Sequence, residues 1–349
     1  MSSKITLFNF SGNYLAELDK VPSVRSWVRD DFGRAQFTLS TKAPQCTERN
    51  LRYGNLVLIE HVPSTATPTH GQLPPWVGVI MPTRIWTLGN VQVTAYTPEY
   101  LLQYRGMPQG TINGPPGNLF SQLIQDAAAV SGFYSGGTPI YPGAIDASGP
   151  TISEIVTSSA YDHIKSIVTK SGNDWNITGV KDANNKLWLY ANWYLNIEAA
   201  TNLLLADSNS SIDASTPILT ENGPIYNAVY GQSQTQNLSP VSSQQDLASM
   251  GQYGILHVIQ TFPVTDQNSV TVAAQQFIAA NSQPRMVVTP TALDTALTFG
   301  SLFVGAIVQY STLAVGFQGG ALGMTQQYCI NSMEYDDMKN ECALVLGSP

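Results

Sequence analysis

Short apolar runs separated by polar connections fill the first 100 residues of the chain. Six of these runs are rich in Val, Ile, Phe, Trp and Thr, as β-strands are, and they are ITLFNF, SVRSWVRD, AQFTLS, NLVLIEHV, WVGVIMPTRIW and NVQVTAY. The connections DDFGR, LRYGN and TLGN place Gly or Asn where a tight turn needs a positive φ. This pattern predicts a small barrel or sandwich over residues 1–100, with a proline-rich loop from His61 to Trp76.

Beyond Tyr100 the spacing of apolar residues changes to that of amphipathic helices. The segment NGPPGNLFSQLIQDAAAVSG is expected to form one helix, with Asn118 as its N-cap and Gly132 as its end. The segment SSAYDHIKSIVTKSG is expected to form a second, which Gly172 terminates. A hairpin with the turn DANNK follows, so residues 101–222 are predicted to be a mixed α/β domain. The two apolar stripes comprise Leu119, Leu123, Ala127 and Val130, and Tyr161, Ile164 and Val168.

A third helical pattern interrupts the strands of the C-terminal third. It follows the stretch QQDLASMGQYG, in which Asp246 and Tyr253 are expected to fix a turn. The helix in NSVTVAAQQFIAANSQP is expected to begin at Asn268 or Ser269 and to end before Pro284. Residues 246–284 are therefore predicted to be a helix-containing insertion. The helix face comprises Val270, Ala273, Ala274, Phe277 and Ile278.

The insertion is predicted to lie within a second β domain, which combines residues 223–245 with residues 285–349. The strand in PIYNAVYG has no sheet of its own, so its partners are expected among RMVVTP, SLFVGAIVQYSTL, GMTQQYCINSMEYDD and NECALVLG. The apolar run from Ser301 to Phe317 contains polar residues and is too short for a membrane span. It is expected to be two strands joined by a turn.

The charge content narrows the possible functions. Charged residues make up 11% of the chain, against roughly 25% in an average soluble protein. Such a composition fits a protein inside a fixed assembly, where unpaired charge is costly to bury, although a neutral soluble β protein shares it. The net charge of −8 argues against binding to nucleic acid phosphates. The N-terminus MSSKITLFNF lacks the pattern of a signal peptide, and isolated cysteines indicate a reduced compartment.

The residues that carry chemistry in other proteins do not assemble into a predicted site. None of the histidines has a second ligand at a metal-binding spacing, so they are interpreted as structural or surface residues. The cysteines of the last two strands are expected to be free thiols. The acidic residues near the C-terminus are interpreted as solvated surface of a turn. These residues are His61, His70, His163 and His257; Cys329 and Cys342, with Cys46 elsewhere; and Glu334, Asp336 and Asp337.

Three short motifs match known sites only in part. YGQSQTQ lacks the second Gly of a nucleophile elbow, and DANNK lacks the sixth-position Gly and closing Glu of an EF-hand. GFQGGALG lacks the Lys-Ser/Thr of a phosphate-binding loop. They are interpreted as a strand end, a hairpin turn and a loop between strands. No catalytic, cofactor-binding or metal-binding residue is predicted.

Taken in order, these segments resemble the baseplate hub, or tail tip hub, proteins of tailed bacteriophages and related contractile machines. The pattern G-x-A-x-F at Gly33–Phe37 and the pattern D-x-x-S-x-x-x-Y-G at Asp246–Gly254 match those of the family. YGNLVLI stands where G-D-x-V-x-V is more usual. The ordered series runs from Ile5 to Leu346 and comprises DDFGRAQFTLS, LRYGNLVLIE, WVGVI, YDHIKSIVTKSGNDWNI, LWLYA, IYNAVYG, DLASMGQYG and NSQP.

The resemblance implies a fold and a set of partners. Hubs of this family are trimers in which each chain contributes two tube-like antiparallel β-barrels, so that three chains present a pseudo-sixfold ring to a sixfold tail tube. The fold implied is mainly β with α+β modules. The chain would be a homotrimer in the virion tail tip or baseplate, assembled in the host cytoplasm. It would contact the tail tube or distal tail protein, a tip or spike protein and the tape measure protein, and would line the channel for genome release without specific nucleic acid binding, enzymatic activity or a cofactor.

Three alternatives stay open from the sequence. The first is a tail protein that degrades the cell wall, and the second is a receptor-binding or carbohydrate-binding tip module. Tryptophans in β segments suggest the second, although core packing explains most tryptophans in strands; these are Trp76, Trp86, Trp188 and Trp193. The third is a tailocin or an injection machine built from the same parts.

Overall fold

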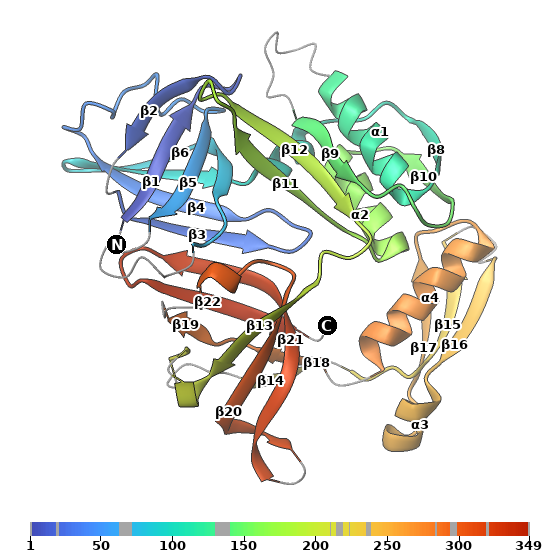
Figure 1. Cartoon of the computed structure of the whole chain (residues 1–349). Coiled ribbons are helices and arrows are strands. Elements are labelled where there is room, and N and C mark those ends of the chain that lie inside the picture. The colour runs from blue at the N-terminus through green and yellow to red at the C-terminus, as the bar shows by residue number, and fades with distance from the viewer. Residues whose placement is uncertain are drawn as a thin grey trace.

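The computed structural model shows a mostly β, α+β fold (Figure 1). It describes residues 2–18, 21–62, 72–129, 140–209, 211–213, 219–222, 224–234, 239–282, 285–293, 299–318 and 321–347. The N-terminal strands are β1 (Ser2–Phe8), β2 (Tyr14–Leu18), β3 (Ser23–Val28), β4 (Arg34–Ser40), β5 (Leu56–Val62), β6 (Trp76–Thr87) and β7 (Asn90–Tyr96). These strands include all six that the sequence predicts; β2 was not predicted. The predicted loop after His61 lies mostly outside the described residues.

Two of the glycines in the predicted turns have the positive φ that was expected there, and the third, Gly33, does not. Gly54 and Gly89 have φ of 88° and 86°, which a side chain would disfavour. In DDFGR the positive φ falls on Asp30 instead, at 53°. Gly33 is needed for space, because a Cβ there would lie 2.0 Å from the carbonyl oxygen of Ser26.

The middle of the chain forms helices packed on small sheets, as predicted. It contains η1 (Pro98–Tyr104), β8 (Gly110–Gly114), α1 (Pro116–Ala129), β9 (Ile140–Ile145), β10 (Ile152–Val156), α2 (Ala160–Ser171), β11 (Asp174–Lys181) and β12 (Leu187–Tyr194). Helix α2 is capped by Ser159 and ends at Gly172 in the left-handed region, and DANNK is the turn between β11 and β12. The prediction of Asn118 as N-cap is wrong, because α1 begins two residues earlier at Pro116. Val130 and Gly132 lie outside the described residues.

The last third of the chain returns to strands. It contains β13 (Ala199–Ala206), η3 (Asp207–Asn209), β14 (Leu219–Asn222), β18 (Arg285–Val288), β19 (Thr291–Leu293), η4 (Phe299–Ser301), β20 (Ala306–Gln318), β21 (Ala321–Asp336) and β22 (Glu341–Gly347). The apolar run from Ser301 to Phe317 belongs mainly to the single strand β20, so the prediction of two strands joined by a turn is wrong. Strand β13 was missed, and it pairs in parallel with β20. No helix among the described residues is long and apolar enough to cross a membrane.

Strand β21 joins the two ends of the chain into one 14-stranded sheet by pairing with β3. The sheet encloses two separate buried clusters, one centred on the N-terminal strands and one on β20–β22. Figure 1 shows the N-terminal strands in blue above the C-terminal strands in red. Among the described residues the pairings close no barrel, so two closed tubes are not seen within this one chain.

A separate three-stranded sheet carries the segment that was expected to join the C-terminal strands. Strand β15 (Ala228–Ser233) pairs with β16 (Val241–Gln245) and with β17 (His257–Phe262), so the expected pairing with strands after Pro284 is wrong. The reason is local: β17 was not recognised as a strand, and it supplies the missing parallel partner. The correction concerns strand pairing, and the division into four domains stays a prediction.

Two helices accompany this sheet, where one was predicted. Helix α4 (Gln267–Asn281) packs on one face through Val270, Ala273, Ala274 and Ile278, as predicted, but its N-cap is Asp266. Helix α3 (Leu247–Tyr253) has Asp246 as its N-cap, and the carboxylate of Asp246 accepts hydrogen bonds from the N–H groups of Ala248 and Ser249. The QQDLASMGQYG stretch is therefore a capped helical turn between β16 and β17.

Replacing Asp246 by Ala is expected to lower the free energy of unfolding measurably, because two helix N–H groups lose their acceptor. Urea unfolding of the full chain measures this change. Gln245→Ala is the matched control, since Gln245 is exposed and adjacent. Equal stability of the two variants would show that the cap contributes nothing.

Candidate functional site

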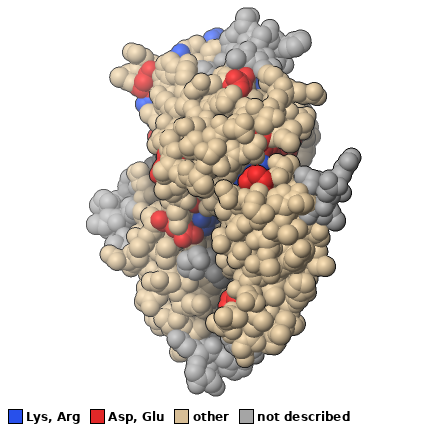
Figure 2. All heavy atoms as spheres, turned by 90° about the vertical axis from the view of Figure 1, so that its right-hand side faces the viewer, with Lys and Arg blue, Asp and Glu red and all other residues tan. Residues whose placement is uncertain are grey.

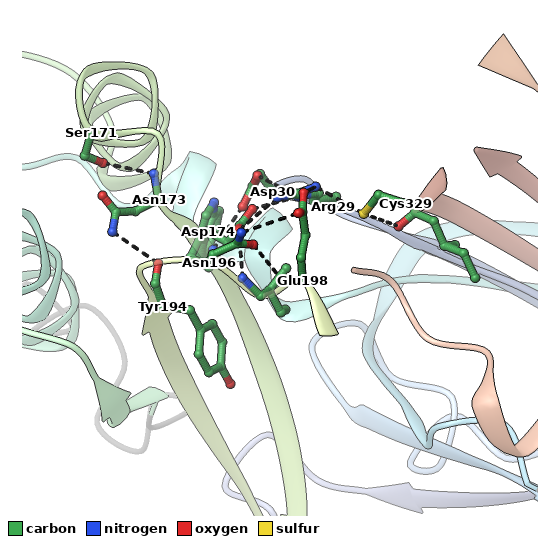
Figure 3. Close-up of polar contacts among 12 residues, drawn as sticks. Arg29, Asp30, Ser171, Asn173, Asp174, Tyr194, Asn196, Glu198 and Cys329 are labelled. Carbon is green, nitrogen blue, oxygen red and sulfur yellow. Dashed lines mark hydrogen bonds and ion pairs between the residues drawn. The ribbon is translucent and has the colours of Figure 1, made fainter. Parts of the chain in front are cut away.

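A densely connected polar group lies around the guanidinium of Arg29, just after β3 (Figure 3). Its Nε and Nη2 donate to the two carboxylate oxygens of Asp174 at 2.7 and 3.0 Å. Its Nη1 donates to Glu198 at 2.9 Å and contacts the sulfur of Cys329 at 3.3 Å. These partners lie on β11, on the segment before β13 and on β21. One side chain thus links the N-terminal strands, the α/β part and the C-terminal strands.

Carboxylates outnumber cations at this junction. Asp30 accepts the N–H of Trp175 at 2.9 Å, and its other oxygen lies 3.9 Å from Nε of Arg29. Burial, together with the negative charge of Asp174, raises the pKa of Asp30 to about 7. Although burial opposes its charge, the hydrogen bonds to Asp174 and Glu198 raise the pKa of Arg29 above its ordinary value. Arg29 is therefore a permanent cation that shares its charge among several acids.

A cavity of about 590 Å³ adjoins the junction. Its lining includes the carboxylates of Asp30, Asp31, Glu99 and Glu198, and aromatic rings of Trp27, Trp76, Trp175 and Tyr194. Glu99 is 5% exposed, and its Oε1 accepts the N–H of Ile177 at 2.7 Å. Burial raises the pKa of Glu99 to about 7, although hydrogen bonds from Thr97 and Ile177 favour its charged form.

The two thiols of the C-terminal strands are unreactive. Cys329 and Cys342 are free, as predicted. Burial raises the pKa of Cys329 to about 11 and that of Cys342 to about 12, so both are protonated at neutral pH. They are packing residues of the C-terminal strands.

A second polar cluster imitates a Ser-His-Glu relay on α2. Nδ1 of His163 lies 2.7 Å from Glu154, and Nε2 lies 3.1 Å from the hydroxyl of Ser158. The backbone N–H groups of Thr157 and Ser158 also point at Nε2, at 3.0 and 2.9 Å. They occupy the one lone pair that a general base needs, and Nδ1 consequently donates to Glu154. The arrangement fixes the entry to α2, and Lys170 neutralises Glu154 from 2.6 Å.

The other residues considered from the sequence lie apart from the junction. His61 is buried against the rings of Phe299 and Tyr335, His257 is exposed, and His70 is outside the described residues. The described part of the chain has no group of three His, Cys, Asp or Glu side chains that could hold a metal ion. YGQSQTQ starts within β15 and runs past its end at Ser233, and GFQGGALG includes the end of β20 and the start of β21. Residues 235–236 and 319–320 of these motifs lie outside the described residues.

The interpretation of the C-terminal acids as solvated residues of a turn is wrong in two respects: Glu334 and Asp336 lie within β21, and Asp337 is buried. Glu334 is exposed, but Asp337 is only 4% exposed. Its carboxylate accepts hydrogen bonds from the hydroxyls of Ser3 and Ser23 at 2.7 and 2.6 Å and pairs with Arg25 at 3.4 Å. The tetrad connects β1 and β3 to the turn after β21. The physical reason is that β21 pairs with β3, which places the turn against the first strands.

The tryptophans divide between core and surface. Trp76 and Trp193 are fully buried, as core packing predicts, whereas Trp86 is 60% exposed near the end of β6. Trp188 is partly exposed, with Nζ of Lys186 at 4.0 Å from its ring centre.

The sequence analysis missed the junction residues. Their one local signal is the run RDD at residues 29–31, because three successive charges are unusual in a chain with 11% charged residues. Asp174, Glu198 and Glu99 have no such signal. They meet Arg29 and its cavity only through the tertiary fold.

Comparisons with known proteins agree on the fold. No protein-family profile and no curated protein sequence matches the chain. Among solved structures, the tail protein from Neisseria meningitidis MC58 has a TM-score of 0.62 at 11% identity, over 100% of this chain and 97% of that one. Prophage tail protein gp18 from Listeria monocytogenes EGD-e has a TM-score of 0.59 at 11% identity, over 99% and 94%. The chain has the fold of phage tail proteins.

A third match extends this result. The 43 kDa tail protein of prophage MuSo2 from Shewanella oneidensis has a TM-score of 0.58 at 10% identity, over 99% of this chain and 98% of that one. At such identities the likeness concerns the fold. It confirms, at the level of fold, the resemblance to tail proteins that the order of sequence segments predicts.

Proposed function

We propose that the chain is a structural component of a phage tail, a homotrimeric hub that adapts a sixfold tail tube to a threefold tip and surrounds the channel for genome release. The observation that carries the proposal is the likeness to phage tail proteins over 99–100% of the chain. Each chain has one set of N-terminal strands and one set of C-terminal strands. Three chains would therefore supply six such sets, which suits a ring with six positions. The role is non-enzymatic.

The distribution of charged residues supports a role inside a permanent protein assembly. Figure 2 shows the face at the right of Figure 1, on which Lys, Arg, Asp and Glu occur in few places. Residues 223–284 contain no Lys or Arg and only two acids, Asp246 and Asp266. Both acids cap helices. Such a surface loses little hydration energy on contact with another protein, so it suits a permanent interface with tail tube, tip or tape measure partners.

The expected result of native mass spectrometry on the purified chain is a trimer, and averaging of tail ends by electron cryomicroscopy should show the chain as a threefold ring below the tube. A monomer both in solution and in the particle would overturn the trimeric hub. Clearing of peptidoglycan in a zymogram by the purified chain would instead favour a wall-degrading role.

A further inference from the structure

A second cavity, of about 700 Å³, lies where the turn between β1 and β2, the segment before β5 and the end of η1 come together. Two of its lining residues are charged, and both are arginines, Arg52 and Arg105. Among the described residues no acid lines it, although the chain has 24 acids against 16 bases. The cavity is therefore a local concentration of positive charge on an acidic protein.

Neither arginine has a counterion within the described part of the chain. The side chains of Arg52 and Arg105 make no ion pair and no hydrogen bond there, whereas Arg25 and Arg29 both pair with aspartates. Arg52 is exposed and Arg105 is half-buried, so both guanidiniums are accessible to a ligand in the cavity. A concave site lined by one sign of charge raises the local concentration of ions of the opposite sign. The site therefore attracts anions.

The neutral polar groups in and beside the lining do not oppose an anion. Oδ1 of Asn9 accepts the N–H groups of Ser11 and Asn13 at 3.0 and 2.9 Å, which leaves its Nδ2 to donate. The hydroxyls of Tyr100 and Tyr104 lie 2.6 Å apart, and this hydrogen bond is the main cause that raises the pKa of Tyr100 to about 12. Tyr100 therefore stays uncharged at neutral pH.

Aromatic rings of the lining are open to contact. Tyr53 and Tyr104 are 49% and 64% exposed, so a ligand can pack on them without displacing core residues. The ring of Phe10 lies beside Gly54, where an added Cβ would approach it to 3.2 Å. Flat rings gain contact area by packing against other rings. The lining therefore suits an anion that is attached to a ring.

The presence of two guanidiniums favours a phosphate over a carboxylate. One guanidinium already matches a carboxylate with two parallel hydrogen bonds. A phosphomonoester carries a charge of about −1.5 to −2 and three strong acceptor oxygens, so it suits a pair of guanidiniums. A volume of about 700 Å³ lies within the range of small-molecule sites. The net charge of −8 still opposes a long polyanion, so the expected ligand is a small phosphate.

We propose that this cavity binds a phosphomonoester attached to a ring, with Arg52 and Arg105 as its counterions and with Tyr53 and Tyr104 against the ring. The ring belongs either to a sugar phosphate or to a nucleotide. All of these residues come from one chain, so the site does not depend on the proposed hub function.

The test is isothermal titration calorimetry of the full chain with glucose 1-phosphate and with adenosine 5′-monophosphate at neutral pH. Saturable binding is expected for at least one of them, and none is expected for glucose or adenosine, which lack the phosphate. Arg52→Gln and Arg105→Gln should each weaken binding about tenfold or more, because each removes charge-assisted hydrogen bonds. Arg34→Gln is the matched control, since Arg34 is an exposed arginine of β4 outside the lining, and it should leave the affinity unchanged.

A further variant tests the contact with the ring. Tyr104→Leu should weaken binding of the tighter ligand about threefold or more, because it removes an exposed aromatic face. Tighter binding of glucose 1-phosphate supports a sugar phosphate, and tighter binding of adenosine 5′-monophosphate supports a nucleotide. The proposal is overturned if neither phosphate binds, if the ring without phosphate binds as tightly, or if Arg52→Gln and Arg34→Gln have equal affinities. None of these results depends on trimer formation, so the proposed hub function stands or fails separately.

Discussion

Replacement of Asp337 by Ala is expected to lower the free energy of unfolding by about 3–5 kcal/mol, because it leaves the charge of Arg25 buried without its partner. Arg25 is fully buried, and burial lowers its pKa while Asp337 raises it. Ser3 and Ser23 lose their acceptor in the same change. Since these residues tie β1 and β3 to the end of β21, the loss falls on the contact between the two ends of the chain. Urea unfolding monitored by circular dichroism measures it.

Two further variants define what the tetrad contributes. Glu334→Ala changes an exposed acid three residues away and should alter stability by no more than about 0.5 kcal/mol. The double variant Arg25→Met with Asp337→Leu removes both charges and should recover most of the loss, because apolar packing often replaces a buried ion pair without penalty. Equal stability of Asp337→Ala and Glu334→Ala would refute the assignment of Asp337 as a buried counterion.

The elements of this fold were largely predictable, since strands and helices follow from local patterns. The six N-terminal strands, the ends of α2 and the DANNK turn depend on residues close in sequence. Strand partners were less predictable. Strand β17 reads HVIQTF, in which exposed residues alternate with half-buried ones and only Phe262 is buried, so its sequence lacks the apolar face by which the other strands were recognised. Because β17 was not recognised as a strand, β15 was assigned to the strands after Pro284 instead of to β17.

The candidate site was not predictable for a related reason. Arg29 meets Asp174 across 145 residues and Glu198 across 169, and Asp337 meets Arg25 across 312. A carboxylate beside apolar residues in sequence looks the same whether it faces water or a guanidinium from another strand. The expectation that these C-terminal acids face solvent is correct for Glu334, which lies on β21, and wrong for Asp337 in the turn after it. Only the pairing of β21 with β3 distinguishes them.

The stability of the chain is expected to fall as pH rises from about 5 to about 8. Asp30 and Glu99 have ordinary pKa values of 3.8 and 4.5, and burial raises the pKa of each to about 7 in the folded chain. Between these values the folded state binds more protons than the unfolded state, so the free energy of unfolding decreases with pH. Their contribution is complete below pH 4 and is lost as pH passes 7. Each acid accounts for a change of the order of a few kcal/mol.

Glu99→Gln isolates this effect from other groups that titrate in the same range. The amide is neutral at every pH and keeps an oxygen for the N–H of Ile177. The variant should therefore match the wild-type chain near pH 5 and exceed it in stability near pH 8, where the wild type carries a buried charge. Urea unfolding at pH 5, 6.5 and 8 gives the comparison. A variant less stable than wild type at pH 8 would mean that hydrogen bonds satisfy the Glu99 carboxylate in its charged form.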